Sequence, residues 1–487
     1  MNFEQKIIAS ISSRNSLIYI ATEEEQRLEY TINYISKKNF RAQIYKWDFI
    51  DGYKNNPNYK NKAKTNPLKA LDLIQNNSSY TKTIFLLKDF HFFMNDLSII
   101  RKIKNISEWI KKTNTYIIMI GTESKIPKDL YEYINFLKFP LPNQQEIKLE
   151  LKRLLSIVKL NNQISLEDLS VAYKGFSINR IRKSVAKIII NKNINSKIFT
   201  IILEEKKQFI QQTEILDFYS SDQDLEDIGG LNNLKKWLQI RSFTFSKKAK
   251  YYGIPNPKGI MLTGIQGTGK SLCAKTISKQ WNLPLLKFDI SKIFAGILGE
   301  SEKKIQQMIN ICEEISPCIL WIDEIDKIFT KNNNNYDSGT TNRVNNIFLT
   351  WLSEKNSNIF IVATANNIDN LPIEMIRKGR FDEIFFLNLP NFKERLHIFK
   401  IHLKKVRPLT WQKYNIYYLS KITKKFSGAE IQQAIIEAMN NAFYESREFN
   451  TNDIIIATKI IIPLAFTDKT MISKLQVWSK SGKIRTA

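Results

Sequence analysis

Short apolar runs alternate with longer amphipathic stretches in the second half of the chain. The apolar runs lie at residues 259–263, 285–288, 319–322 and 359–363. Stretches in which apolar residues recur at helical spacing separate these runs, and one of them covers residues 271–280. Strands that alternate with helices in this way predict a doubly wound α/β sheet with parallel strands.

A different pattern follows the last of these strands. Between residues 391 and 465 the strand signals become sparse, and apolar residues recur at helical spacing over residues 392–403 and 429–443. This pattern predicts a helical subdomain that follows the sheet.

Short sequences of the first half recur in the same order in the second half. The repeated features are the runs ending at Asp48 and Asp289, the apolar runs ending at Asp89 and Asp323, Thr122 and Thr364 after an apolar run, Leu-Pro-Asn with a following Glu at 141–146 and 389–394, and Phe-Ser at 176 and 426. Apolar runs recur by chance in any α/β protein, but the Leu-Pro-Asn match with its Glu is more specific than periodicity. We therefore expect an internal duplication.

Composition changes how the charge is interpreted. A length of 487 residues is enough for two or three domains of about 150 residues each, and 43% hydrophobic residues exclude global disorder. Lysine and arginine number 73 against 47 acids, which gives a formal charge of +26. Residues with A/T-rich codons are in excess, which indicates an A/T-rich genome such as that of an organelle or a reduced bacterium. Codon drift toward lysine accounts for the charge without a polyanionic partner, and no block of like charges appears.

Other patterns exclude several classes of protein. Cys273, Cys312 and Cys318 cannot all pair and form no Cys-x-x-Cys motif, so we expect buried, reduced thiols. The histidines lack the spacing of a zinc site. No run approaches about 18 uninterrupted apolar residues, and the first residues lack the basic start of a signal peptide. We expect a soluble protein without a transmembrane segment.

Residues 264–271 carry the strongest chemical signal. They fit the phosphate-binding pattern G-x-x-x-x-G-K-[ST] with Gly264, Ile265, Gln266, Gly267, Thr268, Gly269, Lys270 and Ser271. The glycines let successive backbone N–H groups face phosphates. Lys270 is expected to reach the β- and γ-phosphates of ATP, and Ser271 to bind Mg²⁺. The alternative is a chance match on a turn, but a predicted strand precedes the motif and a predicted helix follows it.

Two acids follow the apolar run at 318–322. Asp323, at the strand tip, can hold Mg²⁺ through water, and Glu324 can orient and polarise the attacking water. Two solvated acids are the alternative interpretation, which the upstream phosphate-binding motif disfavours.

These motifs, together with four others, resemble the AAA+ ATPase module of the AAA clade. The others are Asp-Ile-Gly-Gly-Leu at 227–231, Gly-Ile-Pro at 253–255, Thr-Ala-Asn at 364–366 and Arg-Lys-Gly-Arg-Phe-Asp at 377–382. The resemblance covers residues 225–465. The whole chain resembles the AAA domain-containing proteins of hypothetical chloroplast reading frames in algal plastids and cyanobacteria. The resemblance implies a P-loop NTPase fold, ATP hydrolysis with Mg²⁺, and a homo-oligomeric ring, which is a hexamer in this family.

The resemblance also implies roles for further residues. Asn366 matches the sensor-1 residue that places the attacking water, and Arg377 and Arg380 match arginine fingers, which act on ATP held by the neighbouring subunit. For these arginines a surface ion pair is the alternative. Positions that match adenine- and ribose-contacting residues are Asp227, Ile228, Gly229, His402, Gly428 and Ala429. For His402 the alternative is an ordinary, partly buried helix residue.

The expected organisation has five segments. They are a degenerate AAA-like α/β module without a P-loop over 1–205, a linker over 206–224, an AAA+ ATPase α/β domain over 225–390, a helical lid over 391–467 and a carboxyl-terminal tail over 468–487. In the first module the duplication places residues 22–29, with three adjacent glutamates, where the second half has its P-loop. Carboxylates would repel phosphate, so this module is expected to bind no nucleotide.

These expectations favour a ring-forming motor that uses ATP hydrolysis to remodel a protein partner. The alternatives are a slow ATP-dependent switch or docking module and, with less support, a nucleic-acid-associated ATPase, for which the sequence shows no motif. Ile297 stands where the family has an aromatic pore residue, so hydrolysis is better supported than threading of a polypeptide. The resemblance implies a plastid location, in the chloroplast stroma, or the cytoplasm for a cyanobacterial protein.

Overall fold

The computed structural model of the chain divides into two compact units, Met1–Asn195 and Ser196–Ala487. The described residues are 3–13, 16–54, 62–76, 81–122, 126–158, 165–190, 194–211, 215–219, 223–245, 247–290, 292, 300–329, 338–355, 357–367, 370–377, 379–480 and 484–487. The predicted pore residue Ile297 lies outside the described residues.

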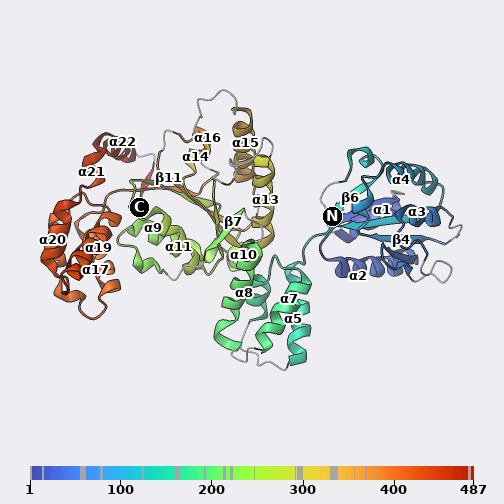
Figure 1. The fold of residues 1–487 in the computed structure, drawn as a ribbon, viewed down its shortest axis with the longest axis horizontal. Coiled ribbons are helices and arrows are strands. Elements are labelled where there is room, and N and C mark those ends of the chain that lie inside the picture. The colour runs from blue at the N-terminus through green and yellow to red at the C-terminus, as the bar shows by residue number, and fades with distance from the viewer. Residues whose placement is uncertain are drawn as a thin grey trace. The chain divides into compact units, whose positions relative to one another are not determined.

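The first unit contains a six-stranded sheet, drawn in blue and cyan in Figure 1. Its strands are β1 (Leu17–Ala21), β2 (Gln43–Asp48), β3 (Gly52–Lys54), β4 (Thr83–Lys88), β5 (Thr115–Gly121) and β6 (Asn135–Lys138). Its helices are α1 (Phe3–Ser12), α2 (Glu25–Ile35), α3 (Pro67–Gln75), α4 (Leu97–Ile110), α5 (Gln144–Val158), α6 (Leu166–Ala172) and α7 (Ile178–Ile190). The strand order is β3-β2-β4-β5-β1-β6, and only β3 runs antiparallel to its neighbour.

The second unit contains a seven-stranded sheet in the order β13-β12-β8-β11-β10-β9-β7. Its strands are β7 (Leu216–Tyr219), β8 (Gly259–Gly264), β9 (Leu285–Phe288), β10 (Cys318–Ile322), β11 (Ile359–Ala365), β12 (Glu383–Leu387) and β13 (Arg485–Thr486). The helices up to the sheet's last long strand are α8 (Ile194–Gln211), α9 (Asn232–Arg241), α10 (Lys247–Tyr251), α11 (Lys270–Trp281), α13 (Glu300–Ile315), α14 (Asp326–Phe329), α15 (Ser338–Glu354) and α16 (Ile373–Ile376). All four strands that the apolar runs predicted are present, within two residues of their expected ends.

A group of helices follows the sheet and forms its own cluster at the red end of the ribbon (Figure 1). These lid helices are α17 (Phe392–Val406), α18 (Ile416–Ile422), α19 (Gly428–Tyr444) and α20 (Thr451–Ile460), followed by α21 (Leu464–Thr467) and α22 (Lys469–Lys480). The helical subdomain predicted after the sheet is therefore present.

The two sheets share one strand order, which supports the internal duplication. Five strands run β6-β1-β5-β4-β2 in the first unit and β12-β8-β11-β10-β9 in the second. In both units the first of these five strands along the chain, β1 or β8, stands second in this order, and consecutive parallel strands are joined through helices.

The Leu-Pro-Asn repeat has a structural cause in both units, because each copy caps a helix. In the second unit the Asn391 side chain accepts from the backbone N–H of Glu394, and the Glu394 carboxylate accepts from the backbone N–H of Asn391. Asn143 and Glu146 exchange the same two hydrogen bonds at α5. This reciprocal cap requires both residues at a fixed spacing, which explains why this repeat stood out in the sequence.

The central strands of the second unit are buried along their whole length, as in β8, β10 and β11. Met261, Leu320 and Ile361 pack on one side of this sheet, and Ile260 and Ile319 pack on the other. Burial on both faces explains why these strands read as continuous apolar runs and not as alternating ones.

The ends of the predicted segments differ from what the sequence suggested. The segment 206–224, expected as a linker, contains the end of α8 and strand β7, which pairs antiparallel with β9. Only Leu216 of this four-residue edge strand is fully buried, so its apolar signal is short. The expected tail forms α22 and β13, and the backbone N–H of Ala487 donates to Phe386 at the edge of the sheet.

Two further expectations bear on the chain's chemistry. Cys273, Cys312 and Cys318 are buried free thiols, as predicted. None of the described helices combines the length and the apolar content needed to cross a bilayer.

Candidate active site

The P-loop motif lies between the end of β8 and the start of α11, where the sequence placed it. Two of its glycines are required by close contacts. A Cβ on Gly264 (φ 133°) would lie 2.2 Å from the carbonyl oxygen of Leu387, and one on Gly267 (φ 74°) would lie 2.8 Å from Ser427 Oγ. The glycines therefore allow the loop to pass between β12 and the start of α19.

Lys270 is buried against the loop that precedes it. Its Nζ donates to the carbonyl oxygens of Gly264 at 2.8 Å and Ile265 at 3.0 Å. Burial lowers the pKa of Lys270 to about 8, although three nearby acids favour the charged form. Phosphate oxygens could therefore replace these two carbonyl oxygens as hydrogen-bond acceptors for the Lys270 ammonium.

Asp323 and Ser271 form an oxygen-rich pair at the carboxyl end of β10. Ser271 Oγ lies 3.4 Å from Asp323 Oδ1, and Thr364 Oγ1 donates to the same oxygen at 2.6 Å. A hydroxyl and a carboxylate are ligands that Mg²⁺ prefers, and Mg²⁺ commonly keeps several waters. The donor set next to the P-loop therefore fits this ion.

Glu324 directly follows Asp323 in a left-handed backbone conformation, with a φ of 52°. Its backbone N–H donates to Thr364 Oγ1 at 2.9 Å, and Asn366 Nδ2 donates to Glu324 Oε1 at 2.9 Å. Lys327 Nζ lies 2.5 Å from the other carboxylate oxygen. Glu324 and Asn366, which the sequence assigned to neighbouring roles, thus lie in direct contact.

Thr364 and Asp326 belong to this constellation, although the sequence gave them no role. Thr364 contacts both acids, as described above. Asp326 is buried, and its carboxylate accepts from the backbone N–H groups of Asn366 at 3.3 Å and Asn367 at 2.9 Å. The sequence signals that could have identified them were a hydroxyl residue two positions before Asn366 and a further acid two positions after Glu324.

The start of α19 contacts the P-loop. The backbone N–H of Ala429 donates to the carbonyl oxygen of Gly267 at 3.1 Å. Ser427 and Glu430 form a reciprocal cap at this helix start. The structure thus brings Gly428 and Ala429, expected at the nucleotide, next to the phosphate-binding loop.

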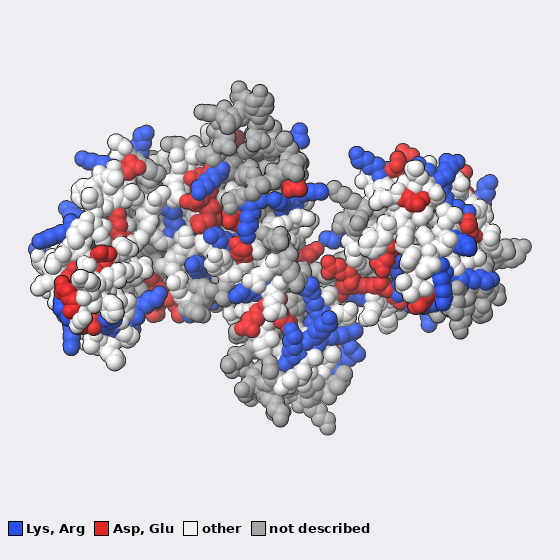
Figure 2. All heavy atoms as spheres, in the orientation of Figure 1, with Lys and Arg blue, Asp and Glu red and all other residues white. Residues whose placement is uncertain are grey.

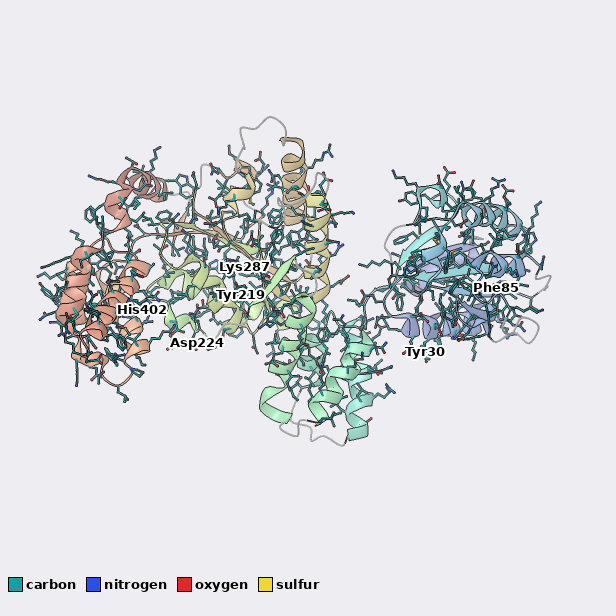
Figure 3. All side chains as sticks on the ribbon, viewed as in Figure 1. Tyr30, Phe85, Tyr219, Asp224, Lys287 and His402 are labelled. Atoms are coloured by element: carbon teal, nitrogen blue, oxygen red, sulfur yellow. The ribbon has the colours of Figure 1, made fainter. Side chains whose placement is uncertain are left out.

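The other expected base-contacting residues lie where the sheet domain meets α17. A Cβ on Gly229 would lie 2.4 Å from Ile398 Cγ1, and Ile228 is buried. His402 is one helical turn beyond Ile398 on α17, so the two share a face. Figure 3 labels His402 among the lid helices. Burial lowers the pKa of His402, which keeps its imidazole neutral near pH 7. Asp227 ends the short helix Leu225–Asp227 before this contact.

The two arginines lie apart from the P-loop of their own chain. Glu383, which follows Arg380 after Phe381 and Asp382, pairs with Ile260 at the start of β8, whereas Leu387 pairs with Gly264 at its end. The length of the strand, at about 3.3 Å per residue, separates the two ends. Arg377 is exposed, and Arg380 Nη1 is buried without a hydrogen-bond partner among the described residues.

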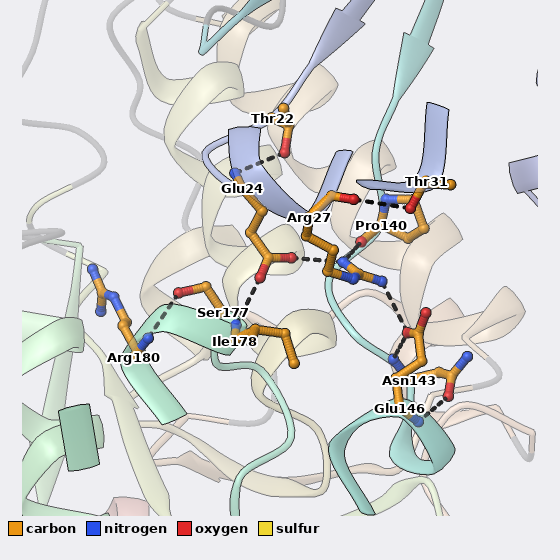
Figure 4. A network of polar contacts seen from close by, with 10 residues as sticks. All are labelled: Thr22, Glu24, Arg27, Thr31, Pro140, Asn143, Glu146, Ser177, Ile178 and Arg180. Atoms are coloured by element: carbon orange, nitrogen blue, oxygen red, sulfur yellow. Dashed lines mark hydrogen bonds and ion pairs between the residues drawn. The ribbon is translucent and has the colours of Figure 1, made fainter. Parts of the chain in front are cut away.

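The corresponding place in the first unit is filled by side chains (Figure 4). Glu24 is buried, and its Oε1 accepts from the backbone N–H of Ile178 at 2.7 Å. Arg27 Nη1 donates to Glu24 Oε2 at 2.6 Å and to Pro140 O at 2.8 Å, and its Nη2 donates to Glu146 at 2.8 Å. These bonds join the start of α2 to the starts of α5 and α7.

The metal-binding position also differs in the first unit. The sequence matched Asp89 to Asp323, but Asp89 has the left-handed φ of 52° that Glu324 has after the equivalent strand. The equivalent of Asp323 is therefore Lys88, because a shared acid at the strand end shifted the sequence match by one residue. Lys88 Nζ lies 2.5 Å from Glu25 and also contacts Glu29.

Lys88 stays charged in this arrangement. Burial alone would lower the pKa of Lys88, but its hydrogen bonds to Glu25 and Glu29 raise it overall. An ammonium group therefore stands in the first unit where the second unit has the Asp323 carboxylate.

Two family models match the chain. The model for the ATPase family associated with various cellular activities (AAA) matches residues 260–389, and the model for the SpoVK-like AAA ATPase N-terminal domain matches residues 3–139. The two matches fall on the two sheets.

Relatives match along the whole chain. An AAA domain-containing protein called ycf46 from Gracilaria tenuistipitata var. liui is 56% identical, with 100% of both chains covered. A protein of the same name from Guillardia theta is 50% identical over 100% of this chain and 97% of the relative. A proteasome-activating nucleotidase of Sulfurisphaera tokodaii is 30% identical over 55% of this chain and 69% of the relative.

Proposed function

The chain belongs to the AAA ATPase family, and we propose that its second unit hydrolyses ATP with Mg²⁺ to remodel a protein partner. The observation that supports hydrolysis best is the set of contacts around Glu324. Asn366 and Thr364, both on or after β11, hold the carboxylate and the backbone of Glu324 beside Asp323. Phosphoryl transfer to water depends on positioning and charge stabilisation, and these contacts position the water-orienting carboxylate.

Each residue around the P-loop has a distinct task in this proposal. Backbone N–H groups of the loop and Lys270 bind the phosphates of ATP. Ser271 and Asp323 would hold Mg²⁺, which neutralises phosphate charge when bound. Glu324 orients the attacking water, and Asn366 fixes the carboxylate that does so.

The position of Arg377 and Arg380 supports a ring. Both lie near the start of β8, whereas the P-loop lies at its end, which supports our proposal that they act on ATP held by another subunit and not on that of their own chain. Guanidinium groups stay charged and spread their donors over phosphate oxygens. We propose a homo-oligomeric ring, a hexamer by family resemblance.

A protein substrate is the partner class we favour. The proteasome-activating nucleotidase that is 30% identical over 55% of this chain supports an action on proteins. A slow ATP-dependent switch that docks a partner without remodelling it is the second candidate. A nucleic-acid partner has less support, because the sequence shows no nucleic-acid-binding motif. Acids lie among the lysines and arginines over much of the face drawn in Figure 2, apart from a group of Lys and Arg at its lower centre.

We propose that the first unit is a docking or assembly module that binds no nucleotide. The Glu24–Arg27–Glu146 network fills the place of the P-loop contacts, and Lys88 replaces the acid that would bind Mg²⁺. The relatives named ycf46 and the A/T-biased composition support a plastid location, which we propose as the chloroplast stroma.

A trapping experiment tests the function. Full-length Glu324→Gln should bind ATP, hydrolyse it at least about a hundredfold more slowly than wild type, and retain the protein partner in a pull-down with ATP. Lys270→Ala, which should bind no ATP, is the matched control. Hydrolysis by Glu324→Gln at the wild-type rate would contradict the assignment of Glu324. Turnover unchanged by the captured partner would favour the switch over the motor.

A further inference from the structure

One lysine contacts two separate points of the segment 377–382, which carries both arginines, and joins them to the start of β8. Lys258 Nζ donates to the carbonyl oxygen of Gly379 at 2.7 Å and to that of Ser353, near the end of α15, at 2.9 Å. The backbone N–H of Lys258 donates to Asp382 Oδ2 at 2.7 Å. We infer that Lys258 is a positioning residue that holds the arginine finger segment in its working geometry, an inference that rests on the proposed action of these arginines between subunits.

The two ends of the segment are fixed by other contacts. Phe381 is buried in the core, and the Asp382 carboxylate accepts from the backbone N–H of Gly259 at 3.0 Å. Upstream, the backbone N–H of Arg377 donates to the carbonyl oxygen of Ile373, the first residue of α16. These contacts set where the segment begins and ends but do not fix the turn between them.

The turn itself is at Gly379. This residue has a φ of 105°, and a Cβ built on it would meet nothing within 4 Å. A side chain at Gly379 would thus have no neighbour to pack against, whereas the carbonyl oxygen of Gly379 is held by the ammonium of Lys258. Arg380 follows directly, so the direction of its guanidinium depends on how Gly379 is held.

Lys258 also directly precedes β8, the strand that leads into the P-loop. β8 begins at Gly259 and ends at Gly264, the first residue of the P-loop. The same lysine thus joins the strand that ends at a subunit's own nucleotide to the segment proposed to act on a neighbour's nucleotide. A charged group that donates to two carbonyl oxygens from separate elements restrains both.

Mixed rings provide the test, because they separate the P-loop of a variant from its finger segment. Lys258→Met alone should bind ATP within about twofold of wild type but lose at least about tenfold in hydrolysis. Mixed with Lys270→Ala, which has a sound finger segment and no nucleotide, it should recover part of the activity. Mixed with Arg380→Ala, it should recover none, because neither variant then supplies a working finger.

Three controls make the outcomes decisive. Lys258→Arg should restore activity, and Lys248→Met, at an exposed lysine of α10, should leave it unchanged. If Lys258→Met does not fold, Lys258→Gln takes its place in the same mixtures. Two results would overturn the inference. The first is recovery of activity when Lys258→Met is mixed with Arg380→Ala. The second is no recovery when Lys258→Met is mixed with Lys270→Ala, although Arg380→Ala does recover with Lys270→Ala. If Arg380→Ala also fails to recover with Lys270→Ala, the finger assignment itself is wrong.

Discussion

Thr364 donates a hydrogen bond from its Oγ1 to Asp323 Oδ1 at 2.6 Å and, with the same oxygen, accepts one from the backbone N–H of Glu324 at 2.9 Å. One hydroxyl on β11 therefore bonds both the carboxylate of Asp323 and the backbone of Glu324, the two acids that follow β10 and that we propose hold Mg²⁺ and orient water. Its removal would loosen both at once.

Thr364→Val should slow ATP hydrolysis by roughly tenfold to a hundredfold, because the isosteric methyl group cannot bond either acid. ATP binding should change by no more than about threefold, since the P-loop is untouched. Steady-state ATPase rates and binding of a fluorescent ATP analogue measure the two effects. Thr364→Ser, which keeps the hydroxyl, is the control, and a valine variant with serine-like activity would refute this role.

ATP affinity should fall as the pH rises above about 8. Burial lowers the pKa of Lys270 to about 8 in the nucleotide-free protein, so at pH 9 most molecules carry a neutral amine there. Phosphate favours the ammonium form, and binding at pH 9 must therefore take up a proton. Calorimetry in two buffers of different ionisation enthalpy measures this uptake, which should vanish at pH 7. Equal proton exchange at both pH values would contradict the prediction.

Hydrolysis should depend on neighbouring subunits. Arg380→Ala has a sound P-loop without its finger, and Lys270→Ala has a sound finger without nucleotide, so each alone should be nearly inactive. Mixed rings pair some working P-loops with working fingers and should recover part of the activity. Specific activity of the wild type should also rise with protein concentration. Full activity in a dilute, demonstrably monomeric sample would rule out action between subunits.

The first unit should bind no ATP. Full-length Lys270→Ala tests this directly, because it disables the second unit and leaves only the first available to nucleotide. Calorimetry should detect no binding at ATP concentrations up to about 1 mM, where a Kd of that size would correspond to about 4 kcal/mol. Micromolar binding of ATP by this variant would show that Glu24 and Arg27 do not prevent nucleotide binding in the first unit.

The network around Arg27 should stabilise the first unit. Arg27→Met leaves the buried Glu24 carboxylate without its main partner and should lower the free energy of unfolding by about 2 kcal/mol. Arg153→Met removes an arginine whose side chain is 57% exposed and should cost less than about 1 kcal/mol. Thermal unfolding of the two variants measures the difference. Equal melting temperatures would contradict a stabilising role for the network.

Much of the second unit could be predicted because its signals are local. Continuous apolar runs mark strands buried on both faces, and the P-loop and the acids after β10 each lie within a few residues in sequence. Lys258 and Thr364 could not be found this way, because their roles come from contacts with segments more than 35 residues away. The match of Asp89 to Asp323 was wrong for the same reason. It rested on the identity of one residue, whereas the true equivalence follows from the position of each residue relative to its strand, which only the folded sheet defines.

The Glu24–Arg27–Glu146 network has a consequence for how the protein senses its surroundings. A nucleotide bridging two subdomains comes and goes with its concentration in solution, whereas these charges are covalently part of the chain. Their effective concentration is set by the fold and is independent of any diffusible pool. On our proposal that the first unit binds no nucleotide, this network would keep α2 joined to α5 and α7 at any ratio of ATP to ADP, and only the second unit would respond to the energy state of the compartment.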